Sequence, residues 1–358
     1  MTFNSMSRHS MSRRSLLGGL FGSALVPGLA AAKTDLGGTN PTSSIPTDPA
    51  GLYAPLSPEE YLAAIRGGGV DYDDIPSIDA PQFWIAAEAD NLLDGGDIVF
   101  GFVHGGEARA YPQRIMVRHE VVNDTVGGLP VAITYCPLVG DVLAVERGDE
   151  TFGVSGRIVN SNLVLFDREN RAHVPQMLGI WIDGSMAGRA LVEHPVAWTT
   201  WDRWRALHPN TAVMCPPPGR AFANYTDPYG DYNPLRGYYL PDRPPMFPPL
   251  HVDERFPPKR VFIGARTPDR AVAFDLALLR HSGVLEVEAD GAMFTAVYDA
   301  DLDTGHVFAG PSAGSPRLEG AFPDRVHWPH GPGPRKINGF QAMWFAWVGF
   351  YPDVAVRA

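Results

Sequence analysis

The sequence predicts an α+β, strand-dominated protein with two tandem related units, each containing a hairpin and a helix that carries tryptophans. Glycine (38) and proline (34) make up about a fifth of the 358 residues, which favours a loop-rich fold with strands over a helical bundle. Gly127-Gly128 and Asp290-Gly291 each lie between β-rich runs, the pattern of a hairpin turn. The two turns are 163 residues apart, and so are Tyr135 and Tyr298.

Composition and charge describe an ordinary globular protein that is long enough for two domains. Charged residues make up 19% of the chain and hydrophobic residues 45%, and the formal net charge is −11. We expect no nucleic-acid partner, because binding to phosphates needs a basic face.

The first 32 residues have the features of an export signal. Arg13 and Arg14 form a twin-arginine pattern, a mildly apolar run covers residues 16–29, and three alanines at 30–32 offer a cleavage site. The apolar run is too short and too rich in glycine to span a membrane as a stable helix, so we expect no stable span after signal removal. An ordinary secretory signal and a retained anchor are the alternatives. Twin-arginine export predicts a periplasmic or secreted protein.

Residues 33–96 are predicted to form an N-terminal arm and one helix. Residues 33–56 are rich in threonine, proline, glycine and serine. The stretch from Ser57 to Glu60 is typical of a helix start, with a cap, a proline in the first turn and acidic residues near the N-terminus. We expect this helix to reach about Arg66, where three glycines follow.

The first unit is predicted to cover residues 97–213. It should hold two strands, a short helix at about residues 112–117, the hairpin around Gly127-Gly128, and a second helix. Trp201 and Trp204 in that second helix fall on one face and are expected in the core.

The second unit, predicted for residues 257–358, repeats this order with a helix at about 275–281. Its tryptophans, Trp344 and Trp347, follow the first pair at a spacing of 143, so this unit is about 20 residues shorter. The proline- and tyrosine-rich residues 214–256 join the units as a linker or a lid.

A candidate site follows from counting across the first hairpin turn. If Gly127-Gly128 is a two-residue turn, residues whose numbers sum to 255 face each other, which pairs His119 with Cys136 at a Cβ separation of roughly 5 Å. Asn123 would share their face, whereas Glu120 would point the other way.

The second unit is expected to lack this candidate site. In it, Ser282 and Asp299 stand at the positions of His119 and Cys136, and the segment that is missing falls in the region after Cys136. The second unit would therefore keep the scaffold without the chemistry.

The run from His119 to Leu138, with its Asn-Asp-Thr-Val-Gly-Gly and Thr-Tyr-Cys-Pro-Leu segments, resembles the domain-of-unknown-function 3179 family of exported bacterial and archaeal proteins. The resemblance continues through residues 152–168, resumes at 344–353, and covers most of residues 97–356. It implies no established activity. Many members have a second cysteine where this chain has Val139, so we expect no Cys-x-x-Cys site here.

Metal binding is the first functional prediction, because a thiolate with an imidazole suits copper or zinc. His119 and Cys136 are too few for a tight site, and Asp141 just past the Cys136 turn is the first additional candidate. Such a metal site would allow a redox-linked function. Further candidate ligands are Asn160, Asn162, Asp167 and His173.

A cysteine-dependent enzyme is the second prediction. His119 would lower the pKa of the Cys136 thiol and carry its proton, and Asn123 would orient the imidazole. A disulfide between Cys136 and Cys215 would exclude this chemistry and the metal site alike.

A non-catalytic exported module, for binding or structure, is the third prediction. Polar residues after the hairpin are then the candidate ligand-binding groups, with Arg157 facing an anionic ligand beside Asn160 and Asn162.

Overall fold

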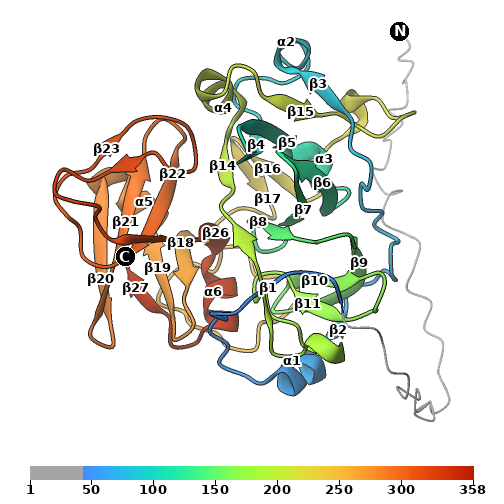
Figure 1. Cartoon of the computed structure of the whole chain (residues 1–358). Helices are drawn as coiled ribbons and strands as arrows, with labels where there is room; N and C mark the ends of the chain where they lie inside the picture. Colours follow the sequence, from blue (N-terminus) through green and yellow to red (C-terminus); the bar gives the residue numbers. More distant parts are fainter. Residues whose placement is uncertain (1–42) are drawn as a thin grey trace, which may run out of the picture. The chain divides into compact units, whose positions relative to one another are not determined.

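About 39% of the computed structural model is strand and about 13% is helix, which confirms the predicted α+β class. The structure describes residues 43–358, and the predicted export signal lies outside these residues. Figure 1 labels the elements along the chain. The described residues contain six α-helices: α1 (Pro58–Ala64), α2 (Ala86–Ala89), α3 (Gln113–Met116), α4 (Trp201–Leu207), α5 (Leu276–Ser282) and α6 (Trp344–Phe350).

Helix α1 begins where the sequence predicts it. The Ser57 side chain accepts a hydrogen bond from the Glu60 N–H, and the Glu60 carboxylate accepts one from the Ser57 N–H at 2.8 Å. This reciprocal capping satisfies two amide donors that a helix start leaves free. The helix ends at Ala64, two residues before the expected end.

Two sheets contain most strands of residues 97–214. The order of the first is β14 (Ala197–Thr200), β4 (Ile98–His104), β5 (Glu107–Pro112), β15 (Ala212–Met214) and β3 (Phe83–Ile85). In this sheet β4 and β5 are joined as a hairpin, and β15 pairs with β5 in parallel. The order of the second is β13 (Glu193–His194), β8 (Asp141–Glu146), β7 (Leu129–Cys136) and β6 (Val121–Val126).

Two sheets of residues 257–358 have a related strand order, with no counterpart of β3 and with the second sheet given from its opposite edge. One sheet has the order β26 (Gly339–Met343), β18 (Val261–Arg266), β19 (Ala271–Asp275) and β27 (Ala355–Arg357), and β27 pairs with β19 in parallel. The other has the order β20 (Val284–Ala289), β21 (Ala292–Asp299), β22 (Thr304–Ala309) and β25 (Arg335–Ile337). That the two regions are copies of one unit stays our prediction.

One further four-stranded sheet follows the first hairpin and positions the candidate site. Its order is β11 (His173–Pro175), β10 (Asn162–Asp167), β9 (Phe152–Val159) and β2 (Arg66–Gly67). Three two-stranded sheets complete the described chain: β1 (Thr47–Asp48) with β12 (Ala190–Leu191), β16 (Gly230–Tyr232) with β17 (Leu235–Gly237), and β23 (Arg317–Leu318) with β24 (Val326–His327).

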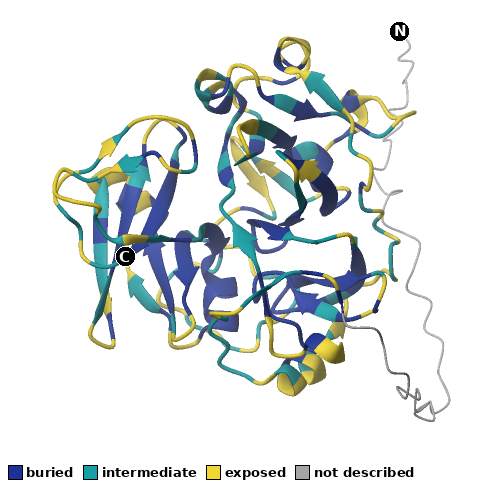
Figure 2. Ribbon diagram, viewed as in Figure 1, coloured by how far each residue is buried: buried dark blue, intermediate teal, exposed yellow. Residues whose placement is uncertain are grey.

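The predicted tryptophan pairs lie in the core. Trp204, Trp344 and Trp347 have no exposed surface, and Trp201 is 3% exposed. Helix α6 is buried along its whole length, as Figure 2 shows in dark blue. Apolar residues at i and i+3 therefore mark core helices here, as the sequence indicates.

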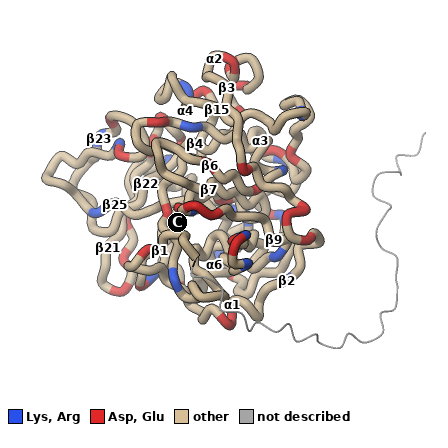
Figure 3. The backbone as a smooth tube through the Cα atoms, turned by 45° about the vertical axis from the view of Figure 1, so that its right-hand side comes forward, with Lys and Arg blue, Asp and Glu red and all other residues tan. Residues whose placement is uncertain are grey.

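Charged residues of both signs are interspersed along the described chain (Figure 3). No helix within residues 43–358 is both long enough and apolar enough to cross a membrane.

Candidate functional site

The predicted hairpin is present with the predicted register. Val121 pairs with Thr134 and Val126 with Leu129, so partners sum to 255, and the turn glycines have φ of 54° and 83°. These positive φ angles are the reason why two glycines occupy the turn. Strand β6 begins only at Val121, so His119 precedes the strand.

Glu120 forms a sharp turn at the start of this strand. Its φ is 58°, and the Val121 N–H donates to the His119 carbonyl at 2.6 Å, which closes a three-residue turn centred on Glu120. The alternation of side chains along a strand does not extend through such a turn. The Glu120 carboxyl therefore lines the same cavity as Cys136, and the prediction that it points away is wrong.

His119 is held away from the thiol by two other hydrogen bonds. Its Nδ1 lies 2.7 Å from the Pro76 carbonyl, and its Nε2 lies 3.0 Å from the Tyr225 hydroxyl. Burial lowers the pKa of His119, which favours a neutral ring that donates from Nδ1 to Pro76 and accepts from Tyr225. The structure does not form the predicted imidazole–thiol pair, because the turn at Glu120 ends the pairing before His119.

Cys136 is a buried thiol at the end of β7, opposite Asp141 on β8. Its Sγ accepts from the Leu163 N–H at 3.4 Å and donates to the Ser161 carbonyl at 3.7 Å. Burial raises the pKa of Cys136 well above its ordinary value, and the carboxyls of Asp141 and Glu120 raise it further. The group is a neutral thiol in the resting protein.

Glu120 and Cys136 line a cavity of about 80 Å³ with mostly apolar walls. This volume has room for a group of a few heavy atoms. Tyr229 and Arg157 also line it. The other lining residues are Gly68, Val70, Ile75, Leu138, Val154, Gly156, Ile158, Leu163, Met246 and Phe247.

The Glu120 carboxyl is the least compensated group in this cavity. The residue is 7% exposed, and within the described chain its carboxyl has no hydrogen-bond or ion-pair partner. Burial alone raises the pKa of Glu120 to about 8, so the acid is mostly protonated at pH 7. Tyr229 is close enough that Glu120 and Cys136 add to the effect of burial, which raises its pKa to about 12.

Sequence reasoning missed Glu120 and Tyr229, although one signal pointed to Glu120. At the spacing of 163, the residue equivalent to Glu120 is Gly283, which has a φ of 76°. A backbone position that needs positive φ ordinarily holds glycine, so a glutamate there is informative. Tyr229 comes from a loop and carries no comparable signal.

Asn123 supports the sheet and not the thiol. Its side-chain amide donates to the Phe152 carbonyl at 2.9 Å and to Asp79 at 2.7 Å, and its oxygen accepts from the Phe152 N–H at 3.0 Å. Asn123 therefore fastens β6 to β9, and the expected role in orienting His119 has no contact to support it.

Most of the predicted polar residues after the hairpin make hydrogen bonds to other parts of the chain and do not line the cavity. The Asn160 side chain accepts from the Leu250 N–H at 2.7 Å, and Asn162 donates to Gln176 at 2.8 Å. Asp141 is fully buried, one of its oxygens has no hydrogen-bond partner, and burial raises its pKa well above the ordinary value. Of these predicted residues, only Arg157 lines the cavity beside Cys136.

The predicted copper or zinc ligands are not brought together as a set. Among residues 43–358, no group of three or more His, Cys, Asp and Glu side chains is placed to hold a metal ion. His173 bonds instead to Asp183 at 2.7 Å and to the Tyr72 hydroxyl at 2.6 Å, and Asp167 to Asn170 at 2.7 Å. Cys136 and Cys215 are both free thiols, so the alternative of a disulfide is not formed.

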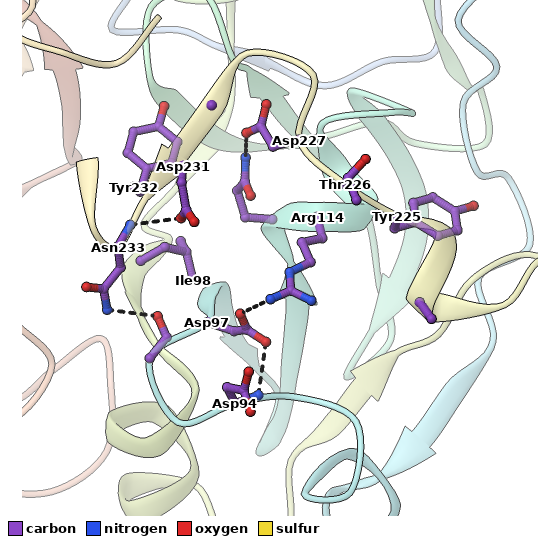
Figure 4. Close-up of a pocket in the computed structure, with 14 residues that line it drawn as sticks. Asp94, Asp97, Ile98, Arg114, Tyr225, Thr226, Asp227, Asp231, Tyr232 and Asn233 are labelled. Atoms are coloured by element: carbon purple, nitrogen blue, oxygen red, sulfur yellow. Dashed lines mark hydrogen bonds and ion pairs between the residues drawn. The ribbon is translucent and has the colours of Figure 1, made fainter. Parts of the chain in front are cut away.

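A second, larger cleft of about 530 Å³ lies beside the loop that supplies Tyr225 and Asp227. Figure 4 shows Arg114 paired with Asp97, and this contact is 2.6 Å long. The Gln113 amide donates to Asp227 at 2.7 Å. Its carboxylates are mostly engaged with neighbouring side chains or amides. The cleft is connected to His119 through Tyr225.

Comparison with known families gives one match. The model of a family described as "Protein of unknown function (DUF3179)" matches residues 72–354, which is most of the chain. No curated protein matches the chain, and no solved structure does.

Proposed function

Because the chain belongs to the DUF3179 family of proteins of unknown function, we propose a function from the cavity itself. The protein binds a small organic molecule in the Glu120–Cys136 cavity, and Glu120 donates a proton or a hydrogen bond to it. One observation carries this proposal: the buried carboxyl of Glu120 faces the cavity from a backbone turn of positive φ and has no partner in the described chain.

Both features of Glu120 destabilise the folded protein. A left-handed conformation costs a residue other than glycine roughly 1–2 kcal/mol. An acidic group that is buried without a hydrogen bond adds roughly 1–3 kcal/mol. Uncompensated groups of this kind concentrate at functional sites, where a ligand supplies the missing partner.

The chemistry of the cavity suits a ligand with a hydrogen-bond acceptor. Protonated Glu120 is a strong donor in apolar surroundings, and an acid with a raised pKa is well matched to proton transfer near neutral pH. The Tyr229 hydroxyl is a further donor on the cavity wall. Apolar walls with a few polar groups are typical of small-molecule sites.

Ligand-observed NMR with a library of small organic compounds tests this proposal. We expect compounds with a carbonyl oxygen to bind the wild type, to bind Glu120→Gln more weakly, and not to bind Val70→Trp. Val70 is 38% exposed and lines the cavity, so tryptophan there blocks the cavity with little effect on the core. Equal binding to all three proteins would overturn the proposal.

A cysteine-dependent enzyme is the second candidate, with Glu120 in the place predicted for His119. In this reaction, sulfur attacks an electrophilic acyl carbon, the thiol proton moves to the Glu120 carboxylate, and Glu120 returns it to the leaving group. A carboxylate whose pKa is about 8 is a much better base than an exposed one. Acetylation of Cys136 by p-nitrophenyl acetate, followed by mass spectrometry, should then slow at least tenfold in Glu120→Gln.

Copper or zinc binding is the weakest of the three candidates. Cys136 has two carboxyls near it, Glu120 and Asp141, but this set lacks the arrangement that holds a metal. Elemental analysis for copper and zinc, carried out on the purified wild type and on Cys136→Ser, tests this candidate. Metal present in the wild type and lost in the variant would restore this function.

Export through the twin-arginine route is part of the proposal and is supported by the sequence of residues 1–32. A periplasmic reporter fused to these residues tests it. Export should stop when Arg13 and Arg14 are both replaced by lysine.

A further inference from the structure

Arg157 gives the cavity a charge preference, and this inference rests on the function proposed above. Arg157 is the one lining residue that carries a charge at neutral pH, since Glu120 and Cys136 are protonated there. Apolar residues such as Val154, Ile158 and Leu163 form much of the rest of the cavity lining.

The Arg157 guanidinium is held in place but is not neutralised. Its side chain is 33% exposed, and its ion pair with Asp71 is long at 3.5 Å and mostly solvated, because the Asp71 side chain is 73% exposed. The guanidinium lies 5.3 Å from the centre of the Tyr72 ring. Such a contact orients the planar group and leaves several of its N–H donors for another partner.

The strand that carries Arg157 contains a bulge next to this residue. Strand β9 is irregular beside Gly156, where the pairing with β10 shifts, and the Arg157 N–H donates to the Ser155 hydroxyl at 3.1 Å. Bulges of this kind commonly lie next to binding sites and redirect one side chain. Arg157 is therefore positioned at the cavity by the backbone as well as by Tyr72.

We propose that the ligand of this cavity is a small carboxylate whose anionic end binds Arg157 and whose other end reaches Glu120 and Cys136. A guanidinium matches a carboxylate in shape and charge and offers two parallel hydrogen bonds. A neutral interior beyond the arginine accepts the apolar body of the molecule without repulsion.

Paired alkylating reagents test this inference, because iodoacetate and iodoacetamide have nearly the same size and differ in charge. In both reactions a bond forms between Sγ of Cys136 and the reagent carbon, iodide leaves, and the thiol proton goes to solvent. The measured quantity is the ratio of the iodoacetate rate to the iodoacetamide rate at Cys136, followed by mass spectrometry of the full chain at pH 7. Cys215, which is partly exposed, serves as an internal reference.

We expect Arg157→Gln to lower this ratio roughly two- to fivefold, the effect of one partly exposed charge pair. Arg157→Lys should retain most of the ratio. The matched control is Arg171→Gln, since Arg171 also lies over the Tyr72 ring, at 4.1 Å, but does not line the cavity. The ratio in that control should equal the wild-type ratio.

Two results would overturn the inference, and they are distinguishable. If both reagents modify Cys136 and the ratio is the same in wild type and Arg157→Gln, the charge preference is wrong and the cavity is still accessible. If neither reagent modifies Cys136 in the folded protein, while both modify it after unfolding, the cavity does not admit small molecules and the proposed function fails with it.

Discussion

Glu120 and Gly283, 163 residues apart, have the same backbone conformation and make the same backbone hydrogen bonds. Their φ angles are 58° and 76°, and their N–H groups donate to the carbonyls of Met116 and Leu279 at 2.7 and 2.8 Å. The carbonyls of Glu120 and Gly283 themselves accept from the N–H groups of Tyr135 and Tyr298, each at 2.7 Å. Positive φ favours glycine, which Gly283 provides and Glu120 does not. We therefore assign a function to the glutamate at position 120.

Replacing Glu120 by glycine should stabilise the protein while removing ligand binding. Relief of the left-handed conformation contributes roughly 1–2 kcal/mol. The extra freedom of glycine in the unfolded chain offsets roughly 0.5–1 kcal/mol of this. Removal of the buried, unpaired carboxyl adds to this gain, so we expect the free energy of unfolding to increase by at least about 1 kcal/mol, measured by urea denaturation at pH 6.

Gly283→Ala is the matched control for this change. A Cβ at Gly283 meets no atom within 4 Å, so the cost is that of the backbone conformation alone. We expect a loss of about 1 kcal/mol. Loss of stability in Glu120→Gly as well would show that the glutamate side chain stabilises the fold.

The stability of the protein should depend on pH through Glu120. Its pKa is about 8 in the folded state against 4.5 as the ordinary value, so between these pH values the folded protein binds the extra proton. The free energy of unfolding therefore falls as pH rises from 4.5 to 8, by at most about 5 kcal/mol from this group. The contribution is complete below pH 4.5 and lost above pH 8.

Comparison with Glu120→Gln isolates this effect from other buried acids such as Asp141. The stability of the variant relative to wild type should increase steadily in urea denaturation series from pH 5 to pH 8. Glu59→Gln, which removes an exposed carboxyl from α1, is the control for the loss of one acidic side chain. A constant difference between Glu120→Gln and wild type across this range would contradict a raised pKa at Glu120.

The Cys136 thiol should respond to Glu120 and not to His119. In Glu120→Gln, the loss of a nearby carboxylate favours the thiolate, so iodoacetamide should modify Cys136 about threefold faster or more at pH 8.5. In His119→Gln the rate should stay within about twofold of wild type, because no hydrogen bond joins the two side chains. Cys215 is the reference in both variants.

Slower modification of Cys136 in either variant would contradict this prediction, with a different meaning for each variant. Slower modification in His119→Gln alone would restore the imidazole–thiol pair. Slower modification in Glu120→Gln would support the second candidate function, in which the Glu120 carboxylate removes the thiol proton.

Local patterns predicted much of the fold. The Ser57 cap, the Gly127-Gly128 turn with its register, and the buried tryptophans of α4 and α6 each depend on residues within a few positions of one another. Such features follow from backbone geometry and periodicity, which one sequence displays directly.

The site was less predictable because its contacts are distant in sequence. His119 bonds to Pro76 and Tyr225, which are 43 and 106 residues away, and Cys136 contacts Leu163. A single positive φ at Glu120 also changed which side chain faces the thiol. Counting along a strand assumes uninterrupted alternation, and this turn breaks that assumption at the position that matters.

A segment from the proline-rich region covers the cavity, and Ser161 holds it there. Met246 and Phe247 line the cavity, and the Ser161 hydroxyl donates to the Phe247 carbonyl at 2.6 Å and accepts from its N–H at 3.0 Å. Ser161→Ala removes both bonds, which stabilise the covered state by roughly 1–3 kcal/mol. Iodoacetamide should therefore reach Cys136 about tenfold faster, with no change at Cys215.

The matched control for this last change is Ser155→Ala. Ser155 is equally buried and donates to the Val164 carbonyl at 2.5 Å, but it makes no hydrogen bond to residues 246–250. If both alanine variants accelerate the reaction equally, general loosening of β9 and β10 explains the effect and the covering segment has no special part in it. If only Ser161→Ala does so, access to the thiol depends on a segment that sequence reasoning left open as linker or lid, and opening of that segment becomes a step in ligand entry.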